Sequence, residues 1–246
     1  MKSNILIALL TFIWLVLMAD IIWQGTDGKW TIEDAEKIGQ LEVSQYTNQI
    51  MVVAVGDDGA RLCLYESATD CGEVENEVIR QSERKRWKLV LETEAIIGKN
   101  GLGKTKEGDG KTPIGVFLFV KAFGILDNPG TKIEYTKVKE NDYWVDDSGS
   151  SYYNQFVSAN ECVKDWDSAE HIVEYGESYH YVLATSYNSE RIPGRGSAVF
   201  LHCTSEEAEY TAGCIAVPEV YMREIMKWVE PQCVLIIDSE KNILSY

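Results

Sequence analysis

The chain is short of basic residues. Its 246 residues include 23 Lys and Arg against 39 Asp and Glu, which gives a formal net charge of −16 at pH 7. A protein that binds DNA or RNA must offer a basic face to the phosphates, so we expect no nucleic-acid partner. The charge balance says little about the fold itself.

The sequence also lacks the spacings that usually mark a structural zinc site. Its six cysteines and three histidines form no C-x-x-C or H-x-x-x-H pair, the kind of spacing that such sites use. His202, Cys203 and Cys214 are the nearest alternative set. Because consecutive residues of a strand point to opposite faces, His202 and Cys203 cannot easily share a metal ion. We expect no metal ion and no cofactor.

A glycine-rich stretch from Gly98 to Pro113 lacks the helix that a phosphate-binding loop requires. Lys111-Thr112 is followed by Pro113 and an apolar run typical of a strand, and proline at this position stops a helix. The glycines are therefore expected to shape a turn between two strands. A direct substrate contact through Asp109 or Lys111 is the less favoured alternative.

The residues that are abundant indicate a β-rich domain. Hydrophobic residues make up 45% of the chain, with 13 Tyr and 7 Trp, and aromatic residues favour strands. Apolar runs and alternation predict strands at 49–56, 61–65, 87–98, 115–123, 179–185, 198–201, 215–217 and 234–238. Helices are expected at 32–38 and 218–229, the second with an apolar stripe that includes Val220. The predicted fold class is mainly β with a few helices (α+β).

Residues 128–166 follow no clear period and are expected to form long loops. Loops of this length in a compact domain usually serve as lids or binding walls. Their aromatic side chains, which include Tyr152, Phe156 and Trp166, either line a binding surface or close a small core.

The N-terminus predicts export. Residues 5–19 are apolar except for Thr11, and after Asp20 the apolar run continues to residue 23. This length suits a signal peptide or a membrane anchor. Cleavage after Ala19 would put Leu17 where signal peptidases prefer a small residue, so an uncleaved anchor is favoured over a cleaved peptide and over a buried helix. We divide the chain into a signal peptide or anchor at 1–23, a spacer at 24–47 and one domain at 48–246.

Cysteine pairing is expected to be limited. An exported chain can form disulfides, and Cys63 with Cys71, which lie across a short loop, are the favoured pair. The other connectivities stay open.

The stretch from Gly196 to Val217 carries the chemistry. An apolar run delivers His202 at the end of a strand, and Cys214 stands just before a second apolar run. Pairing of the two strands would bring a thiol nucleophile and a base together. Gly213 would let the backbone approach closely, and the N–H groups of Gly213 and Cys214 would serve as oxyanion donors. The alternative is a buried structural cysteine with a hydrogen-bonded histidine.

Three segments resemble one known family. T-A-G-C-I-A-V, preceded by F-L-H-C, is similar to the active-site region of the L,D-transpeptidase (YkuD-type) catalytic domain, as are 107–117 and 187–197. The resemblance covers about half of the chain, from Gly98 to Val217. It implies a YkuD-like β-sandwich or barrel catalytic domain over residues 48–246.

The resemblance also implies a function. It points to a cysteine-dependent L,D-transpeptidase that acts on peptidoglycan stem peptides by acyl transfer through a thioester, in cell-wall cross-linking or remodelling. An L,D-carboxypeptidase with the same machinery, or a non-catalytic wall-binding module, is the alternative. The protein is then expected in the cell envelope, secreted to the wall or held at the membrane by an uncleaved N-terminal segment.

Individual roles follow from the same resemblance. Cys214 is the expected nucleophile and His202 its base, oriented by the carbonyl of Cys203, with a thiolate–imidazolium pair at rest. The substrate-binding residues are expected to be Asn188, Arg191, Arg195 and Thr211, since Arg recognises carboxylates through two hydrogen bonds.

Two departures from the family pattern concern substrate contacts. Ala212 stands where many members carry a second histidine, and Ala216 begins the segment where an arginine is often found. The nucleophile–base pair is unaffected. The choice between cross-linking and trimming of peptides stays open.

Overall fold

The computed structural model describes residues 32–68, 85–205 and 208–246. The predicted N-terminal segment at 1–23 and Cys71 lie outside these residues. The fold is mainly β with few helices, as predicted. The strands are β1 (Gln49–Gly56), β2 (Gly59–Ala68), β3 (Arg86–Ala95), β4 (Gly115–Gly124), β5 (Tyr135–Lys137), β6 (Asp142–Val145), β7 (Gln155–Ser158), β8 (Ala169–His171), β9 (Val182–Thr185), β10 (Phe200–Cys203), β11 (Ile215–Val217) and β12 (Val234–Ser239). The helices are α2 (Ile32–Ile38) and α3 (Glu219–Trp228), with the 3₁₀ helices η1 (Glu42–Gln45), η3 (Ile172–Tyr179) and η4 (Ile243–Ser245).

Nine strands form one sheet that nearly closes on itself. Its order is β11-β10-β9-β4-β12-β1-β2-β3, with β5 paired to β4. The chain just after β3 returns to β11, where Ile96 and Ala216 exchange two backbone hydrogen bonds of 2.9 Å each. Closure of this kind leaves few unpaired backbone groups at the sheet edges. The result is a barrel-like sheet, in agreement with the fold that the family resemblance implies.

Strand β1 is buried on both faces, because the sheet separates two cores. Met51 and Val53 point into the core that also contains α3, whereas Ile50 and Val52 pack on the opposite side against α2. A strand covered on both sides needs a continuous apolar run rather than alternation. The run of apolar residues in β1 meets that need.

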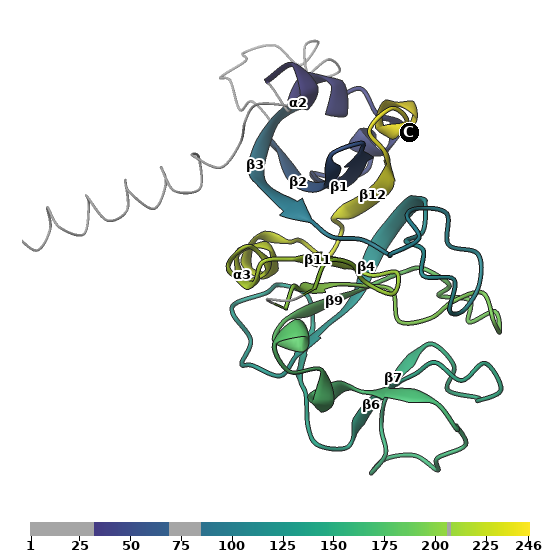
Figure 1. Ribbon diagram of the computed structural model, residues 1–246. Coiled ribbons are helices and arrows are strands. Elements are labelled where there is room, and N and C mark those ends of the chain that lie inside the picture. The colour runs from purple at the N-terminus through teal and green to yellow at the C-terminus, as the bar shows by residue number, and fades with distance from the viewer. Residues whose placement is uncertain (1–31, 69–84, 206–207) are drawn as a thin grey trace, which may run out of the picture.

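Helix α2 belongs to the folded unit. It falls within the residues predicted as a spacer, yet Ala35 and Ile38 are buried in the core shared with β1 and β12. Figure 1 shows α2 at one end of the described structure, with β6 and β7 at the other. The part of the spacer from α2 onward is therefore an outer layer of the domain.

Helix α3 fixes the strand that precedes it. It begins directly after Pro218, which takes the N-cap position, and Met222, Ile225 and Met226 are fully buried. Complete burial of one such side chain contributes about 1.5–3 kcal/mol. Val220 is 58% exposed, so its predicted place in the apolar stripe is wrong, since it lies on the solvent side of the first turn.

The segment predicted as long loops contains short strands. Strands β7, β6 and β8 form a separate three-stranded sheet. Trp144 of this sheet packs against Phe200 of β10 with ring centroids 4.7 Å apart, and Tyr153 and Trp166 are also buried. Strands of three or four residues are too short to show a period, which explains the miss. Of the two alternatives for the aromatic residues, Trp144 and Trp166 contribute to hydrophobic clusters of the core.

Several strand bounds differ from the prediction. Strand β2 is longer than 61–65, and β3 ends at Ala95 rather than at residue 98. The strand expected at 179–185 is shorter, because Tyr179 ends η3 and β9 begins at Val182. His202 lies inside β10 rather than at its end.

Cys63 is a buried free thiol, so the described structure does not contain its expected disulfide.

None of the described helices is long and apolar enough to cross a membrane.

Candidate active site

The register of two parallel strands places Cys214 and His202 on one face. His202 of β10 pairs with Ala216 of β11. Cys214 stands two residues before Ala216, and residues two apart on a strand share a face. Leu201 and Cys203 point the other way, into the core beneath α3. The alternation that separates His202 from Cys203 therefore aligns His202 with Cys214.

Both side chains open onto one cavity of about 400 Å³. Its wall includes Lys104, Glu107, Asp146, Glu170, Tyr175, Ser178, Tyr179, Ser197, Ala198, His202, Thr211, Gly213 and Cys214. The structure thus brings the predicted nucleophile and base together. Within the described part of the chain they are not hydrogen-bonded to each other.

The thiol of Cys214 is held by backbone groups. Its Sγ atom donates to the carbonyl of Ala198 at 3.1 Å and accepts from the N–H of Phe200 at 3.3 Å. Burial and the negative charge of Glu170 raise the pKa of the Cys214 thiol to about 12, although the Phe200 N–H and Lys104 act in the opposite direction. The resting nucleophile is a neutral thiol.

The ring of His202 is oriented by the backbone carbonyl that the family resemblance implies. Nδ1 lies 2.8 Å from the backbone oxygen of Cys203, and Tyr179 packs edge-on against the ring at 5.4 Å. Burial lowers the pKa of His202 to about 4, despite the opposing effect of the carbonyls of Cys203 and Ser178. The imidazole is therefore neutral. Burial thus disfavours the charged form of both groups, which argues against the expected thiolate–imidazolium pair at rest.

Thr211 builds the turn that presents the nucleophile. Its Oγ1 donates to the carbonyl of Cys214 at 2.7 Å and accepts from the N–H of Gly213 at 3.0 Å. The hydroxyl predicted to bind substrate is thus engaged in the turn. The N–H of Gly213 is engaged as well, which removes one of the two expected oxyanion donors. The N–H of Cys214 takes part in none of the described hydrogen bonds.

Gly213 is required by its surroundings. Its φ is +145°, and a Cβ atom built there would lie 2.7 Å from the carbonyl oxygen of Lys111. Only glycine accepts both the dihedral angle and the close approach. The nucleophile turn and the glycine-rich loop are therefore packed backbone to backbone.

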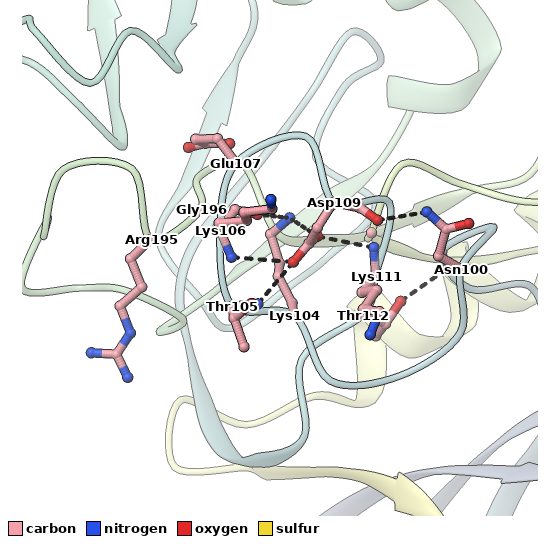
Figure 2. A network of polar contacts seen from close by, with 12 residues as sticks. Asn100, Lys104, Thr105, Lys106, Glu107, Asp109, Lys111, Thr112, Arg195 and Gly196 are labelled. Carbon is pink, nitrogen blue, oxygen red and sulfur yellow. Dashed lines mark hydrogen bonds and ion pairs between the residues drawn. The ribbon is translucent and has the colours of Figure 1, made fainter.

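The glycine-rich loop is organised by Asp109, as Figure 2 shows. This carboxylate accepts hydrogen bonds from the N–H groups of Thr105, Lys106 and Lys111 at 2.8, 3.1 and 3.1 Å, and it pairs with Lys104 at 3.1 Å. Although burial acts to raise it, these contacts lower the pKa of Asp109 to about 2. Its hydrogen-bonding capacity is taken up by the loop, which is the turn between strands that the sequence predicts.

Thr112 joins this loop to the nucleophile. It is fully buried, accepts from the N–H of Gly98 at 2.9 Å and donates to the carbonyl of Cys214 at 3.4 Å. Thr112, three residues before β4 begins, therefore supports the turn that carries Cys214.

The loop at 188–196 does not reach the cavity. The amide of Asn188 donates to the carbonyls of Gly196 and Ile192 at 2.8 and 3.1 Å and accepts from the N–H of Ile192 at 2.9 Å. Arg191 and Arg195 are exposed, and Figure 2 shows the Arg195 side chain extending away from the Asp109 network. Asn188 holds its own loop, and none of the three lines the cavity.

Sequence reasoning missed part of the cavity wall. Glu170 of β8 accepts a hydrogen bond of 2.7 Å from the hydroxyl of Tyr179, and burial raises the pKa of Glu170 to about 7. Glu170 follows the stretch at 128–166 that shows no sequence period, and Tyr179 begins the stretch predicted as a strand, so no signal marked either as a site residue. Glu107 begins the segment at 107–117 that resembles the family, and Lys104 stands three residues before it. Their closeness to that segment was the available signal. Among the described residues, no group of three or more His, Cys, Asp and Glu side chains is arranged to hold a metal ion.

Comparison with known proteins bears on the identity of this site. The family model of the L,D-transpeptidase catalytic domain (YkuD) matches residues 78–237. No curated protein matches the chain. Among solved structures, the helical cell shape determining protein Pgp2 from Campylobacter jejuni is 14% identical with a TM-score of 0.42, over 78% of this chain and 49% of that one. An Enterococcus faecium L,D-transpeptidase mutant is 14% identical with a TM-score of 0.36, over 78% and 50%.

The chain spans about half the length of these two proteins. The family model, in contrast, matches more than half of this chain and includes the glycine-rich loop, His202 and Cys214. The chain belongs to the L,D-transpeptidase catalytic domain (YkuD) family.

Proposed function

We propose that the chain is a cysteine-dependent L,D-transpeptidase that acts on peptidoglycan stem peptides by acyl transfer through a thioester. The observation that carries the proposal is the placement of Cys214 and His202 on one face of neighbouring strands, open to a common cavity. Membership of the family gives this geometry its reaction class.

The chemistry starts from a neutral pair. Sγ of Cys214 attacks the carbonyl carbon of a peptide bond and its proton passes to His202, so that the S–C bond forms first and the C–N bond breaks afterwards. His202 returns the proton to the leaving amine. A second amine, or water, then attacks the thioester and regenerates the thiol. Because Sγ rests against the Ala198 carbonyl, the reaction requires the Cys214 side chain to leave this contact and turn toward His202.

The cavity suits a substrate that carries charges of both signs. Its volume of about 400 Å³ falls in the range of ordinary ligand sites, ~300–1,000 Å³. Glu107, Asp146 and Glu170 line it together with Lys104. A stem peptide, which has both ammonium and carboxylate groups, matches this lining.

The proposed place of action is the cell envelope. The apolar segment at residues 1–23 supports export, with the domain either anchored at the membrane or released toward the wall. The acidic composition, with a net charge of −16, gives no support to a nucleic-acid partner.

The test uses the full chain and a disaccharide tetrapeptide as substrate, with products followed by mass spectrometry. Loss of the terminal D-amino acid and formation of a cross-linked dimer, both absent in Cys214→Ala, would support transpeptidation. Loss of the D-amino acid without a dimer would identify an L,D-carboxypeptidase. An unchanged substrate would leave a wall-binding module and overturn the proposal.

A further inference from the structure

Lys104 is a buried cation beside the nucleophile turn. Its side chain is only 4% exposed, yet it lines the cavity that contains Cys214. No other Lys or Arg lines this cavity among the described residues. The positive charge at the site therefore comes from this one side chain, since burial keeps His202 neutral.

Two glycines make room for it. A Cβ atom at Gly196 would lie 2.6 Å from Cε of Lys104, and one at Gly213 would lie 3.4 Å from Nζ. Their φ angles are +122° and +145°, which side chains other than glycine rarely adopt. The ammonium group is thus packed against the backbone of the residue that precedes the nucleophile.

The ammonium group keeps one donor for the cavity. Nζ donates to Oδ1 of Asp109 at 3.1 Å and to the carbonyl of Lys106 at 3.4 Å. A lysine ammonium has three N–H bonds, so one remains. Asp109 is itself fixed by three backbone N–H groups, and Figure 2 shows Lys104 anchored in this network. A donor held in this way needs no reorganisation during a reaction.

The site lacks one of its two expected oxyanion donors. A tetrahedral intermediate needs donors aimed at its oxyanion, and the N–H of Gly213 is already bonded to Thr211. The N–H of Cys214 alone remains from the expected pair. The ammonium of Lys104 lies next to Gly213 and lines the same cavity, so it is a candidate for the second donor.

We propose that Lys104 is a catalytic residue, whose ammonium group binds the oxyanion together with the N–H of Cys214. This inference rests on the proposed function. When Sγ attacks, the S–C bond forms and the π electron pair of the carbonyl moves to its oxygen, while the thiol proton goes to His202. Lys104 stabilises the negative oxygen and keeps its own protons. Collapse restores the C=O bond and expels the amine, which takes the proton from His202.

The experiment compares two reactions of the same thiol in the full chain. Acylation by a carbapenem passes through an oxyanion, whereas alkylation by iodoacetamide does not, and both are followed on Cys214 by mass spectrometry. In Lys104→Ala we expect acylation to fall by about 10²–10³-fold, as for loss of one oxyanion donor. The factor by which the alkylation rate falls should be less than a tenth of the factor for acylation. Lys106→Ala, an exposed lysine of the same loop, should match the parent in both reactions.

A second measurement guards against simple misfolding. Added propylammonium, which replaces the deleted part of the side chain, should restore acylation of Lys104→Ala in proportion to its concentration. The inference is overturned if acylation of this variant stays within threefold of the parent. It is also overturned if the two reactions slow by the same factor or if propylammonium restores nothing. A parent chain that is not acylated at all would instead refute the proposed function, and this inference with it.

Discussion

The Sγ atom of Cys214 rests 3.1 Å from the carbonyl oxygen of Ala198 and not against the ring of His202. His202 in turn faces the carbonyl of Cys203. Each member of the pair is thus held by backbone in a neutral form. Burial and these backbone contacts therefore keep the thiol in its less reactive neutral form.

The first prediction concerns the pH dependence of the free thiol. Burial raises the pKa of Cys214 to about 12, so the thiolate fraction grows tenfold per pH unit throughout the neutral range. We expect the alkylation rate of Cys214 by iodoacetamide to rise steadily from pH 6 to pH 9. The measurement is the rate at the peptide that contains Cys214. A plateau below pH 8 would show that the thiol is already ionised and would contradict this account.

The second prediction concerns Glu170 and stability. Burial raises its pKa from 4.5 to about 7 in the folded protein, so its contribution is fully present below pH 4.5 and is lost as the pH rises through 7. Glu170→Gln, which cannot ionise, should be more stable than the parent by about 1–3 kcal/mol at pH 8. At pH 4 the two should unfold at similar denaturant concentrations. Equal differences at both pH values would rule out titration as the cause.

The third prediction concerns the buried ion pair in the glycine-rich loop. Asp109 and Lys104 are 7% and 4% exposed, and removal of one partner leaves a buried charge without compensation. Asp109→Asn should lower the free energy of unfolding by about 3–5 kcal/mol. The matched control is Glu66→Gln, which breaks the more exposed pair with Lys88 and should cost less than about 1 kcal/mol. Urea unfolding measures both. If the two variants lose a similar free energy of unfolding, the buried pair stabilises the fold no more than the exposed pair does.

The fourth prediction concerns Gly213. An added Cβ would meet the Lys111 carbonyl at 2.7 Å, whereas Gly103, also at positive φ, has nothing within 4 Å. Gly103→Ala should cost about 1 kcal/mol from backbone strain alone. Gly213→Ala should cost at least twice as much, because the turn must move away from the loop. If both variants unfold at the same urea concentration, the close packing of turn and loop is refuted.

Much of the catalytic segment could be predicted from the sequence. Strand β11 has the predicted bounds, and α3 begins one residue after the predicted start and ends one residue before the predicted end. Apolar runs with clear ends, followed by Pro218, leave little choice of structure. The same runs predicted that Cys214 and His202 would meet, and the carbonyl of Cys203 was expected to orient the ring.

The rest of the site depends on contacts that no local pattern records. Glu170 and Tyr179 enter the cavity from short elements far from Cys214 in the sequence. The bond from Gly213 to Thr211 depends on the shape of one turn. The expected charge state of the pair is opposed for a related reason, since the burial that disfavours both charges is a property of the folded chain.

Acylation of the parent chain and of Cys214→Ala by a carbapenem, followed by intact-mass spectrometry, tests the central claim most directly. The account predicts a single covalent adduct on the parent, none on Cys214→Ala, and adduct formation slowed by about 10²–10⁴-fold in His202→Ala. An unmodified parent, or an adduct that persists in Cys214→Ala, would contradict it.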